Sequence, residues 1–151
     1  MSEHQKPANP IDTPKNRIHH ARLLSGMSIS KISLLTEIHP DYYRHFENNF
    51  LRCRPKTIRA FSTVTGCDLG WIIYGEEQPP MVSLSGDTIG QRLLSFREHR
   101  GISRKQLAQE AFGVSKKASI ASWEREEYSP ELLSLMRIAD AYGVNVVSFI
   151  P

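Results

Sequence analysis

The sequence predicts an all-α protein made of two similar halves, and three observations support this. Apolar residues recur at the spacing of amphipathic helices, and no stretch shows the competing pattern of a strand. The 151 residues are long enough for two small domains of roughly 60–70 residues. Turn residues also repeat at a nearly constant interval, which indicates two copies of one fold. Gly26 and Gly101 lie 75 positions apart, as do Pro55 and Pro130, and Gly66 and Gly143 lie 77 apart.

The boundary between the halves is marked by residues 76–86, which contain two prolines, two serines and a glycine. These residues interrupt the helical pattern. We therefore expect a flexible N-terminus over residues 1–12, a first and more divergent domain over 13–75, a linker over 76–86 and a second domain over 87–151. A flexible linker would leave the relative orientation of the two domains open.

Capping residues and apolar spacing predict the helices of the second half. Ser103 and Ser115 are placed to cap the second and third helices, and Pro130 stands where a fourth would begin. Ile120 and Trp123 fall on one face of the third helix and should point into the core. The predicted order is a helix from 89 that ends at Gly101, helices over 104–111 and 115–123, one from 130, and a closing segment over 144–150.

Several of these residues form a pattern. In the second half it comprises Ile89–Leu93, Gly101–Ser103, Leu107–Ala108, Gly113–Ser115, Ile120, Trp123–Arg125, Pro130 and Ala139–Val144. A weaker version in the first half comprises Arg22–Leu23, Gly26–Ser28, Ile32–Ser33, Tyr43, Phe46–Glu47, Pro55 and Gly66–Gly75. The pattern resembles the lambda-repressor/Cro-like (Xre-type) helix-turn-helix family. The resemblance implies two tandem five-helix domains that bind duplex DNA and regulate transcription, with repression by operator occlusion as the simplest mechanism.

In this family the third helix enters the major groove, and the residues near its start reach base edges. Lysine can donate to guanine, serine can serve several bases, and an alanine methyl can touch a thymine methyl. Two basic residues at the start of the second helix, Arg104 and Lys105, are expected to hold phosphates. The resemblance assigns base contacts in the second half to Lys116, Lys117, Ala118, Ser119 and Ser122.

One departure from the family concerns the turn. The spacing from Ala108 to Trp123 is about two residues longer than usual for the family, and Phe112 is the best candidate for an insertion. We expect a lengthened turn or a third helix that begins a residue early. The surface that meets DNA is unaffected, but the individual contacts are left open.

The first half is open to two interpretations. By the same alignment its third helix begins at Pro40, turns Tyr43 and Phe46 inward, and presents four side chains to DNA: Asp41, Tyr42, Arg44 and His45. Arg52 and Arg54 would then clamp phosphates. However, Ile29 stands where the second half has Arg104, so a polar backbone contact is missing. The alternative is association with another protein through Ile29, Tyr42, Phe50 and Leu51.

The alternative function is accordingly an adaptor or antitoxin-like protein whose first domain mediates protein association and whose second domain binds DNA. The main partner in either case is the major groove of double-stranded DNA. Single domains of this kind usually dimerise on half-sites about one helical turn apart. Here a homodimer is one arrangement, and an internal pair of the two linked domains is another. Two such domains would leave no room in the chain for a separate effector module.

Other functional classes find little support. The net charge of +3 does not by itself indicate a basic partner surface. No apolar run approaches the roughly 18 residues of a membrane span, and the polar N-terminus lacks a signal peptide, so we expect a cytoplasmic, nucleoid-associated protein without membrane contact. Cys53 and Cys67 are expected to be free thiols. No metal, cofactor or enzymatic motif is expected, because the six histidines are scattered and phosphate-loop and nucleophile motifs are missing.

Overall fold

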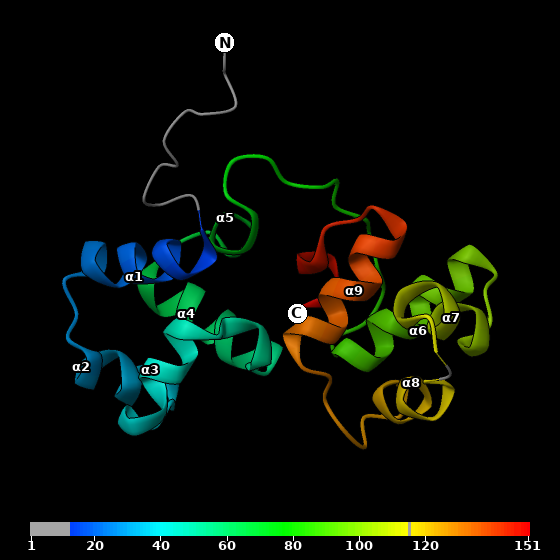
Figure 1. Ribbon diagram of the computed structural model, residues 1–151, viewed down its shortest axis with the longest axis horizontal. Coiled ribbons are helices and arrows are strands. Elements are labelled where there is room, and N and C mark those ends of the chain that lie inside the picture. The colour runs from blue at the N-terminus through cyan, green and yellow to red at the C-terminus, as the bar shows by residue number, and fades with distance from the viewer. Residues whose placement is uncertain (1–12, 115) are drawn as a thin grey trace, which may run out of the picture.

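The computed structural model describes residues 13–114 and 116–151, and these residues contain helices and no strand (Figure 1). This confirms the all-α class. The first half holds α1 (Pro14–Ser25), α2 (Ile29–Thr36), α3 (Pro40–Asn48), the 3-10 helix η2 (Phe50–Arg52), α4 (Pro55–Thr65) and α5 (Leu69–Tyr74). The second half holds α6 (Ile89–Arg100), α7 (Arg104–Phe112), α8 (Lys117–Glu124), α9 (Leu132–Tyr142) and the 3-10 helix η3 (Val146–Phe149). The N-terminal segment 1–12, expected to be flexible, lies outside the described residues.

Equivalent residues begin and end the helices of the two halves. Thr13 caps α1 and Thr88 caps α6, in each case by accepting a hydrogen bond from a backbone N–H three residues later. Ser28 and Ser103 cap α2 and α7 in the same way. Such caps satisfy N–H groups that the first turn of a helix leaves unpaired. Glycines with positive φ then end α1, α4, α6 and α9, where a side chain would be strained.

The interval between equivalent positions changes along the chain. The first helices, α1 and α6, start 75 residues apart, whereas α4 and α9 start 77 apart, because 132 − 55 = 77. The predicted equivalence of Pro55 with Pro130 is therefore wrong, and Leu132 is the counterpart of Pro55. Glu131 keeps an extended backbone, with φ −67° and ψ 156°, so α9 begins two residues later than expected.

The two extra residues lie around the turn between α7 and α8. One lengthens the helix, because α7 has 9 residues and α2 has 8. The other lengthens the turn, which spans residues 113–116 in the second half and 37–39 in the first. Phe112, predicted as the insertion, is the last residue of α7, and its ring packs against Trp123 at 6.1 Å. The third helix starts at Lys117 and not early, while the predicted cap, Ser115, lies outside the described residues.

Each half encloses buried apolar side chains from its own helices. The predicted inward orientation of Tyr43, Phe46, Ile120 and Trp123 is confirmed, since all four are buried. The first core also includes Ile18, Ile32, Ile58 and Phe61, and the second includes Leu93, Leu107, Leu135 and Phe149. Both cysteines are free thiols. No helix of the described residues has the length and apolar character needed to cross a bilayer.

The segment between α5 and α6 is fixed to the second half, which differs from the flexible linker that we expected. The side-chain amide of Asn145 donates to the Pro79 carbonyl at 3.1 Å, and its backbone N–H donates to the Pro80 carbonyl at 3.0 Å. Two residues on, the Val82 N–H donates to the Ser148 hydroxyl at 3.0 Å. Asn145 is itself buried, so these bonds are shielded from water. The linker therefore extends the surface of the second half.

Candidate nucleic-acid interface

The outer face of α8 carries the side chains expected to meet base edges. Lys117 and Ala118, in the first turn, are exposed, while Ser119 and Ser122 are half-buried along the same helix. Ile120 and Trp123 turn the opposite face into the core and fix the rotation of the helix about its axis. An exposed lysine and two hydroxyls at the start of a rigidly packed helix can donate to base edges in a major groove.

Lys116 has a different position from the one expected. It precedes α8 and does not belong to it, and it is half-buried in the turn. Its ammonium lies 5.0 Å from the centre of the Phe112 ring, a cation–π contact that ties the turn to the end of α7. The structure thus places Lys116 beside the helix start and leaves Lys117 as the lysine on α8 itself.

A buried carboxylate joins the three helices around this interface. The Glu124 side chain, at the end of α8, is only 2% exposed. It accepts from Arg97 of α6 through Nε at 2.9 Å and Nη2 at 3.1 Å, and from Arg104 Nε of α7 at 2.8 Å. Burial of a carboxylate is costly unless its charge and lone pairs are satisfied, and two guanidinium groups satisfy both here. The pair of helices α7 and α8 is therefore locked to α6.

The electrostatics of this triad keep Glu124 ionised. Burial alone would raise the pKa of its carboxyl group, but the hydrogen bonds and charges of Arg97 and Arg104 lower it overall. In return, the hydrogen bond to Glu124 raises the pKa of Arg97. Two cations around one anion leave a net positive charge behind the helix pair, which favours an approaching polyanion.

The triad corrects two expectations from the sequence. Glu124 was grouped with Glu126 and Glu127 as a solvated helix end, yet Glu124 is buried and only the other two are exposed. Arg104 was expected to hold a phosphate, whereas its Nε–H donates to Glu124. Residues 20 and 27 positions apart give no local signal for such a contact. A signal did exist in the repeat, because Arg22 and Glu47 occupy the equivalent positions.

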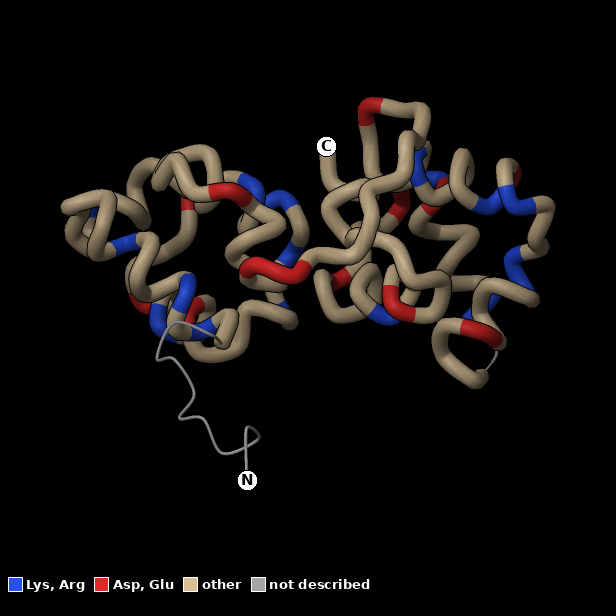
Figure 2. The backbone as a smooth tube through the Cα atoms, turned by 90° about the horizontal axis from the view of Figure 1, so that it is seen from above, with Lys and Arg blue, Asp and Glu red and all other residues tan. Residues whose placement is uncertain are grey.

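Basic residues surround the second half beyond the triad. Lys105, expected beside a phosphate, is exposed in the first turn of α7. Figure 2 shows lysine and arginine positions spread around the outer end of the second half, with acidic positions among them. This distribution suits several phosphate contacts, and it does not amount to a uniformly basic surface.

In the first half, α3 presents the predicted side chains outward. Asp41, Tyr42, Arg44 and His45 are all exposed, and the rings of Tyr42 and His45 lie 5.8 Å apart. The helix is held by one ion pair in place of a triad, with Arg22 Nε donating to Glu47 Oε1 at 2.8 Å. Ile29, at the position of Arg104, packs half-buried against the core and supplies no third charge.

Arg52 and Arg54 do not extend the α3 surface as expected. Arg52 Nε lies 3.2 Å from Glu131 Oε2, and Arg54 Nη1 donates to the Ser129 carbonyl at 2.5 Å. Both acceptors belong to the second half. The two arginines, predicted as phosphate clamps, therefore join the halves of the molecule.

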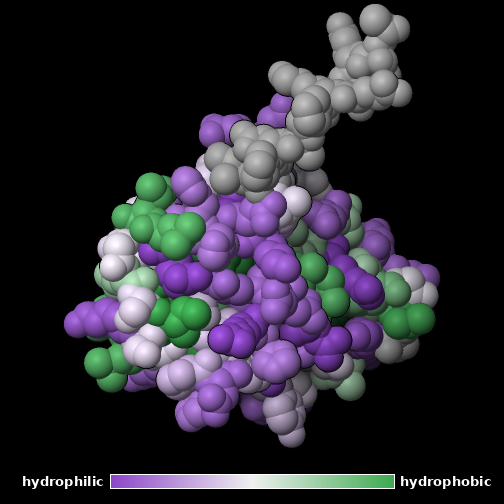
Figure 3. Space-filling model, turned by 60° about the vertical axis from the view of Figure 1, so that its left-hand side comes forward, coloured by the Kyte–Doolittle hydropathy of each residue, from purple (hydrophilic) through white to green (hydrophobic). Residues whose placement is uncertain are grey.

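The residues proposed for protein association are mostly hidden. Phe50 is buried and Leu51 and Ile29 are half-buried, so only Tyr42 of that set is exposed. Other large apolar side chains are exposed on this half instead, and Figure 3 shows apolar groups separated by polar ones on its outer face. The exposed leucines of α1 and α2 are Leu23, Leu24, Leu34 and Leu35.

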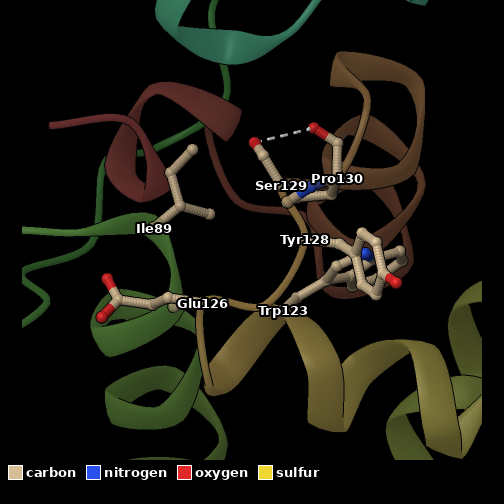
Figure 4. Close-up of a pocket in the computed structure, with 7 residues that line it drawn as sticks. Ile89, Trp123, Glu126, Tyr128, Ser129 and Pro130 are labelled. Carbon is tan, nitrogen blue, oxygen red and sulfur yellow. Dashed lines mark hydrogen bonds between the residues drawn. The ribbon is translucent and has the colours of Figure 1, made fainter.

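A small cavity lies between the start of α6 and the residues that follow α8. Its volume is about 170 Å³, and Figure 4 shows Ile89 and Glu126 on one side and Trp123 and Tyr128 on the other. Ligand pockets usually measure roughly 300–1,000 Å³, so this cavity is small for an organic ligand. Within residues 13–114 and 116–151, no group of three His, Cys, Asp or Glu residues is placed to hold a metal ion.

Comparison with known proteins agrees with this geometry. Residues 93–149 match the helix-turn-helix family model, from within α6 to the end of η3. The immunity repressor protein of Bacillus phage phi105 is 35% identical over 63 residues, and the match covers 42% of this chain and 42% of that protein. No solved structure matches. The family match and the relative together support a helix-turn-helix regulator of the Cro/C1 type, with α7 and α8 as the helix-turn-helix pair.

Proposed function

We propose that the protein binds duplex DNA sequence-specifically and represses transcription by occluding its operator. The observation that carries this proposal is the exposed start of α8, with Lys117 and Ala118 outward, on a helix that a buried ion triad and a core tryptophan hold in place. Rigid positioning matters because base readout requires donors and acceptors to be aligned before contact. Lys105 contributes a backbone contact, and Arg104 positions α7 against α8. The protein acts at the nucleoid, in the cytoplasm.

Repression is favoured over activation by the similarity to a phage immunity repressor. Occlusion requires only that the bound protein cover a promoter element, so it needs no contact with polymerase. The proposal therefore assigns no activating surface to the chain.

We also infer that the first half is a second, diverged copy of the same domain. Thr13, Ser28 and Gly26 repeat the caps of the second half at an interval of 75. The Arg22–Glu47 pair repeats Arg97–Glu124, with each partner shifted by the interval of its own helix. Caps and a semi-buried ion pair at matching places support common architecture more strongly than helix order alone does.

Replacing Lys117 by alanine tests the assignment of base readout to α8. Loss of a good base contact costs about 1–3 kcal/mol, so specific affinity should fall roughly 5- to 150-fold. Affinity for unrelated duplexes should fall much less, because only one charge is removed. Fluorescence anisotropy against a selected duplex and a scrambled duplex measures both quantities.

A matched control for this test is Lys15→Ala, which removes an exposed lysine from α1, at the opposite end of the molecule in Figure 1. This variant should leave both affinities nearly unchanged. If Lys117→Ala lowers specific and nonspecific affinity by the same factor, Lys117 contacts phosphate and the assignment to base readout is wrong.

Protein association by the first half is a second candidate function, favoured by one observation. Leu24 and Leu34 are 68% and 74% exposed, whereas the equivalent positions of the second half hold His99 and Gln109. Large exposed apolar side chains mark interaction surfaces when they cluster. The double variant Leu24→Glu, Leu34→Glu should abolish any concentration-dependent self-association in sedimentation velocity and leave DNA affinity intact. Unchanged association would remove this candidate.

A further inference from the structure

The two halves meet along a seam formed by η2 and the start of α4 on one side and residues 129–132 on the other. Two contacts are those of Arg52 with Glu131 and of Arg54 with the Ser129 carbonyl. A third is a backbone hydrogen bond in which the Leu132 N–H donates to the Cys53 carbonyl at 2.9 Å. Cys53 and Leu132 are buried, so the seam continues the packing of both cores.

The seam contacts are reciprocal. From α4 and α9 onward, equivalent positions lie 77 residues apart, so Arg52 corresponds to Ser129 and Arg54 to Glu131. The contact of Arg52 with Glu131 thus joins the first position to the second. The contact of Arg54 with Ser129 joins the second position to the first. Contacts exchanged in both directions between the same two positions are the mark of a twofold interface, whereas head-to-tail packing joins two different patches.

The closing helices provide a second, independent sign of this symmetry. Helix α5 ends the first half, η3 ends the second, and the two contact each other. Tyr74 of α5 accepts a hydrogen bond from the Val146 N–H of η3 at 3.0 Å. An element that packs on its own counterpart lies beside a twofold axis. Arg59 of α4 reinforces this contact by donating to the Ile150 carbonyl at 2.8 Å.

The symmetry is approximate because the two sequences have diverged. The bond from the Leu132 N–H to the Cys53 carbonyl would be mirrored by a bond from residue 55 to the Pro130 carbonyl. Residue 55 is proline, which has no N–H to donate. One half of that pair of hydrogen bonds is therefore missing for a covalent reason.

A twofold relation has a direct consequence for the two outward helices. The axis that relates the halves also relates α3 to α8, and Figure 1 shows both along the lower edge of the molecule. In helix-turn-helix dimers, twofold symmetry presents two such helices to inverted half-sites on one face of the duplex. The same arrangement here would come from a single chain.

We propose that the chain is an internal pseudo-dimer that reads two different half-sites in inverted orientation and at a fixed spacing. The inference rests on the proposed DNA-binding function and adds its geometry. The two half-sites differ because α3 offers Tyr42, Arg44 and His45 where α8 offers Lys117 and two serines. The operator is therefore an imperfect inverted repeat, and the protein binds it in one direction only.

The first test uses the intact protein and duplexes selected from a random pool. We expect a two-part inverted motif occupied by one chain, with the stoichiometry measured by native mass spectrometry. Arg44→Ala should weaken binding to the two-part duplex about tenfold and leave binding to a duplex with the α8 half-site alone unchanged. Two chains on each two-part duplex, or an affinity for the two-part duplex that Arg44→Ala does not change, would overturn the pseudo-dimer.

The second test asks whether the seam fixes the spacing. Inserting 5 or 10 base pairs between the half-sites should each abolish the gain from the second half-site, because a rigid pair cannot follow either change. A flexible connection would tolerate the 10-base-pair insertion, which restores the face of the helix. Recovery of full affinity with that insertion would contradict the proposal.

A charge swap links this behaviour to the seam itself. Glu131→Arg places a third cation beside Arg52 and Arg54, so it should separate the halves and remove the preference for the original spacing. Adding Arg52→Glu should restore that preference. The control is Glu127→Arg, which alters an exposed ion pair away from the seam. No loss of spacing preference in Glu131→Arg would overturn the role of the seam. A one-part motif would overturn the pseudo-dimer and leave the DNA-binding function standing, whereas no enriched sequence would overturn both.

Discussion

Glu124→Ala is expected to lower the melting temperature by about 6 °C or more. The substitution leaves Arg97 and Arg104 without their shared anion, and breaking a buried ion pair from one side costs about 3–5 kcal/mol. For a chain of this size, each kcal/mol corresponds to roughly 2–4 °C. Differential scanning calorimetry of the variant and the parent protein measures the shift.

Two controls bracket this result. Glu127 pairs with Arg125 on the surface, where both side chains are about half exposed, so Glu127→Ala should leave the melting temperature almost unchanged. Glu47 has a single, semi-buried arginine partner, and Glu47→Ala should cause an intermediate loss. Equal effects of Glu47→Ala and Glu124→Ala would mean that Arg104 adds nothing to the triad.

The triad also predicts how stability depends on pH. Because Arg97 and Arg104 lower the pKa of Glu124 in the folded protein, the unfolded chain binds its proton more readily. The contribution of Glu124 is therefore complete above the ordinary glutamate value of 4.5 and is lost as the pH falls through the lowered folded pKa. Denaturation with urea between pH 3 and about 6 should show a steeper loss of stability in the parent protein than in Glu124→Gln.

The second large effect is expected for Gly90→Ala, near the start of α6. A methyl group at this position would lie 2.5 Å from the Trp123 carbonyl oxygen and 2.9 Å from that of Glu124. Both atoms belong to the backbone at the end of α8, so α6 and α8 would have to separate. Overpacking of this kind costs about 1–3 kcal/mol and outweighs the roughly 1 kcal/mol that alanine gains over glycine in a helix.

Urea denaturation of Gly90→Ala provides the measurement, and Lys15→Ala is a matched control at the equivalent position of the first half. Lys15 is exposed, so that position has room for a side chain. A Gly90→Ala protein as stable as the parent would show that α6 and α8 can adjust at no cost. The predicted close approach of these helices would then be wrong.

Local signals in the sequence predicted much of the fold. Ser28 and Ser103 mark helix starts, and glycines such as Gly101 mark helix ends, because both effects depend on residues within one turn. Apolar spacing oriented α3 and α8 correctly, since it fixes which face of a helix is buried. The start of α9 was missed because Pro130 is compatible with either a helix or the extended segment that precedes it.

Long-range contacts could not be predicted in this way. The partnership of Glu124 with two arginines depends on how three helices cross, and the role of Arg52 and Arg54 depends on how two halves pack. An arginine has the same local pattern whether it faces phosphate, carboxylate or carbonyl. The linker was misjudged for a similar reason, because its partners, Asn145 and Ser148, lie more than 60 residues away.

Selection of duplexes from a random pool by the intact protein tests the central claim most directly. The account predicts enrichment of a defined sequence, bound with an affinity that falls steeply as salt rises and at least about a thousandfold tighter than unrelated DNA. Lys117→Ala should erase most of that preference. Failure to enrich any sequence, with equal affinity for all duplexes, would contradict sequence-specific binding through α8.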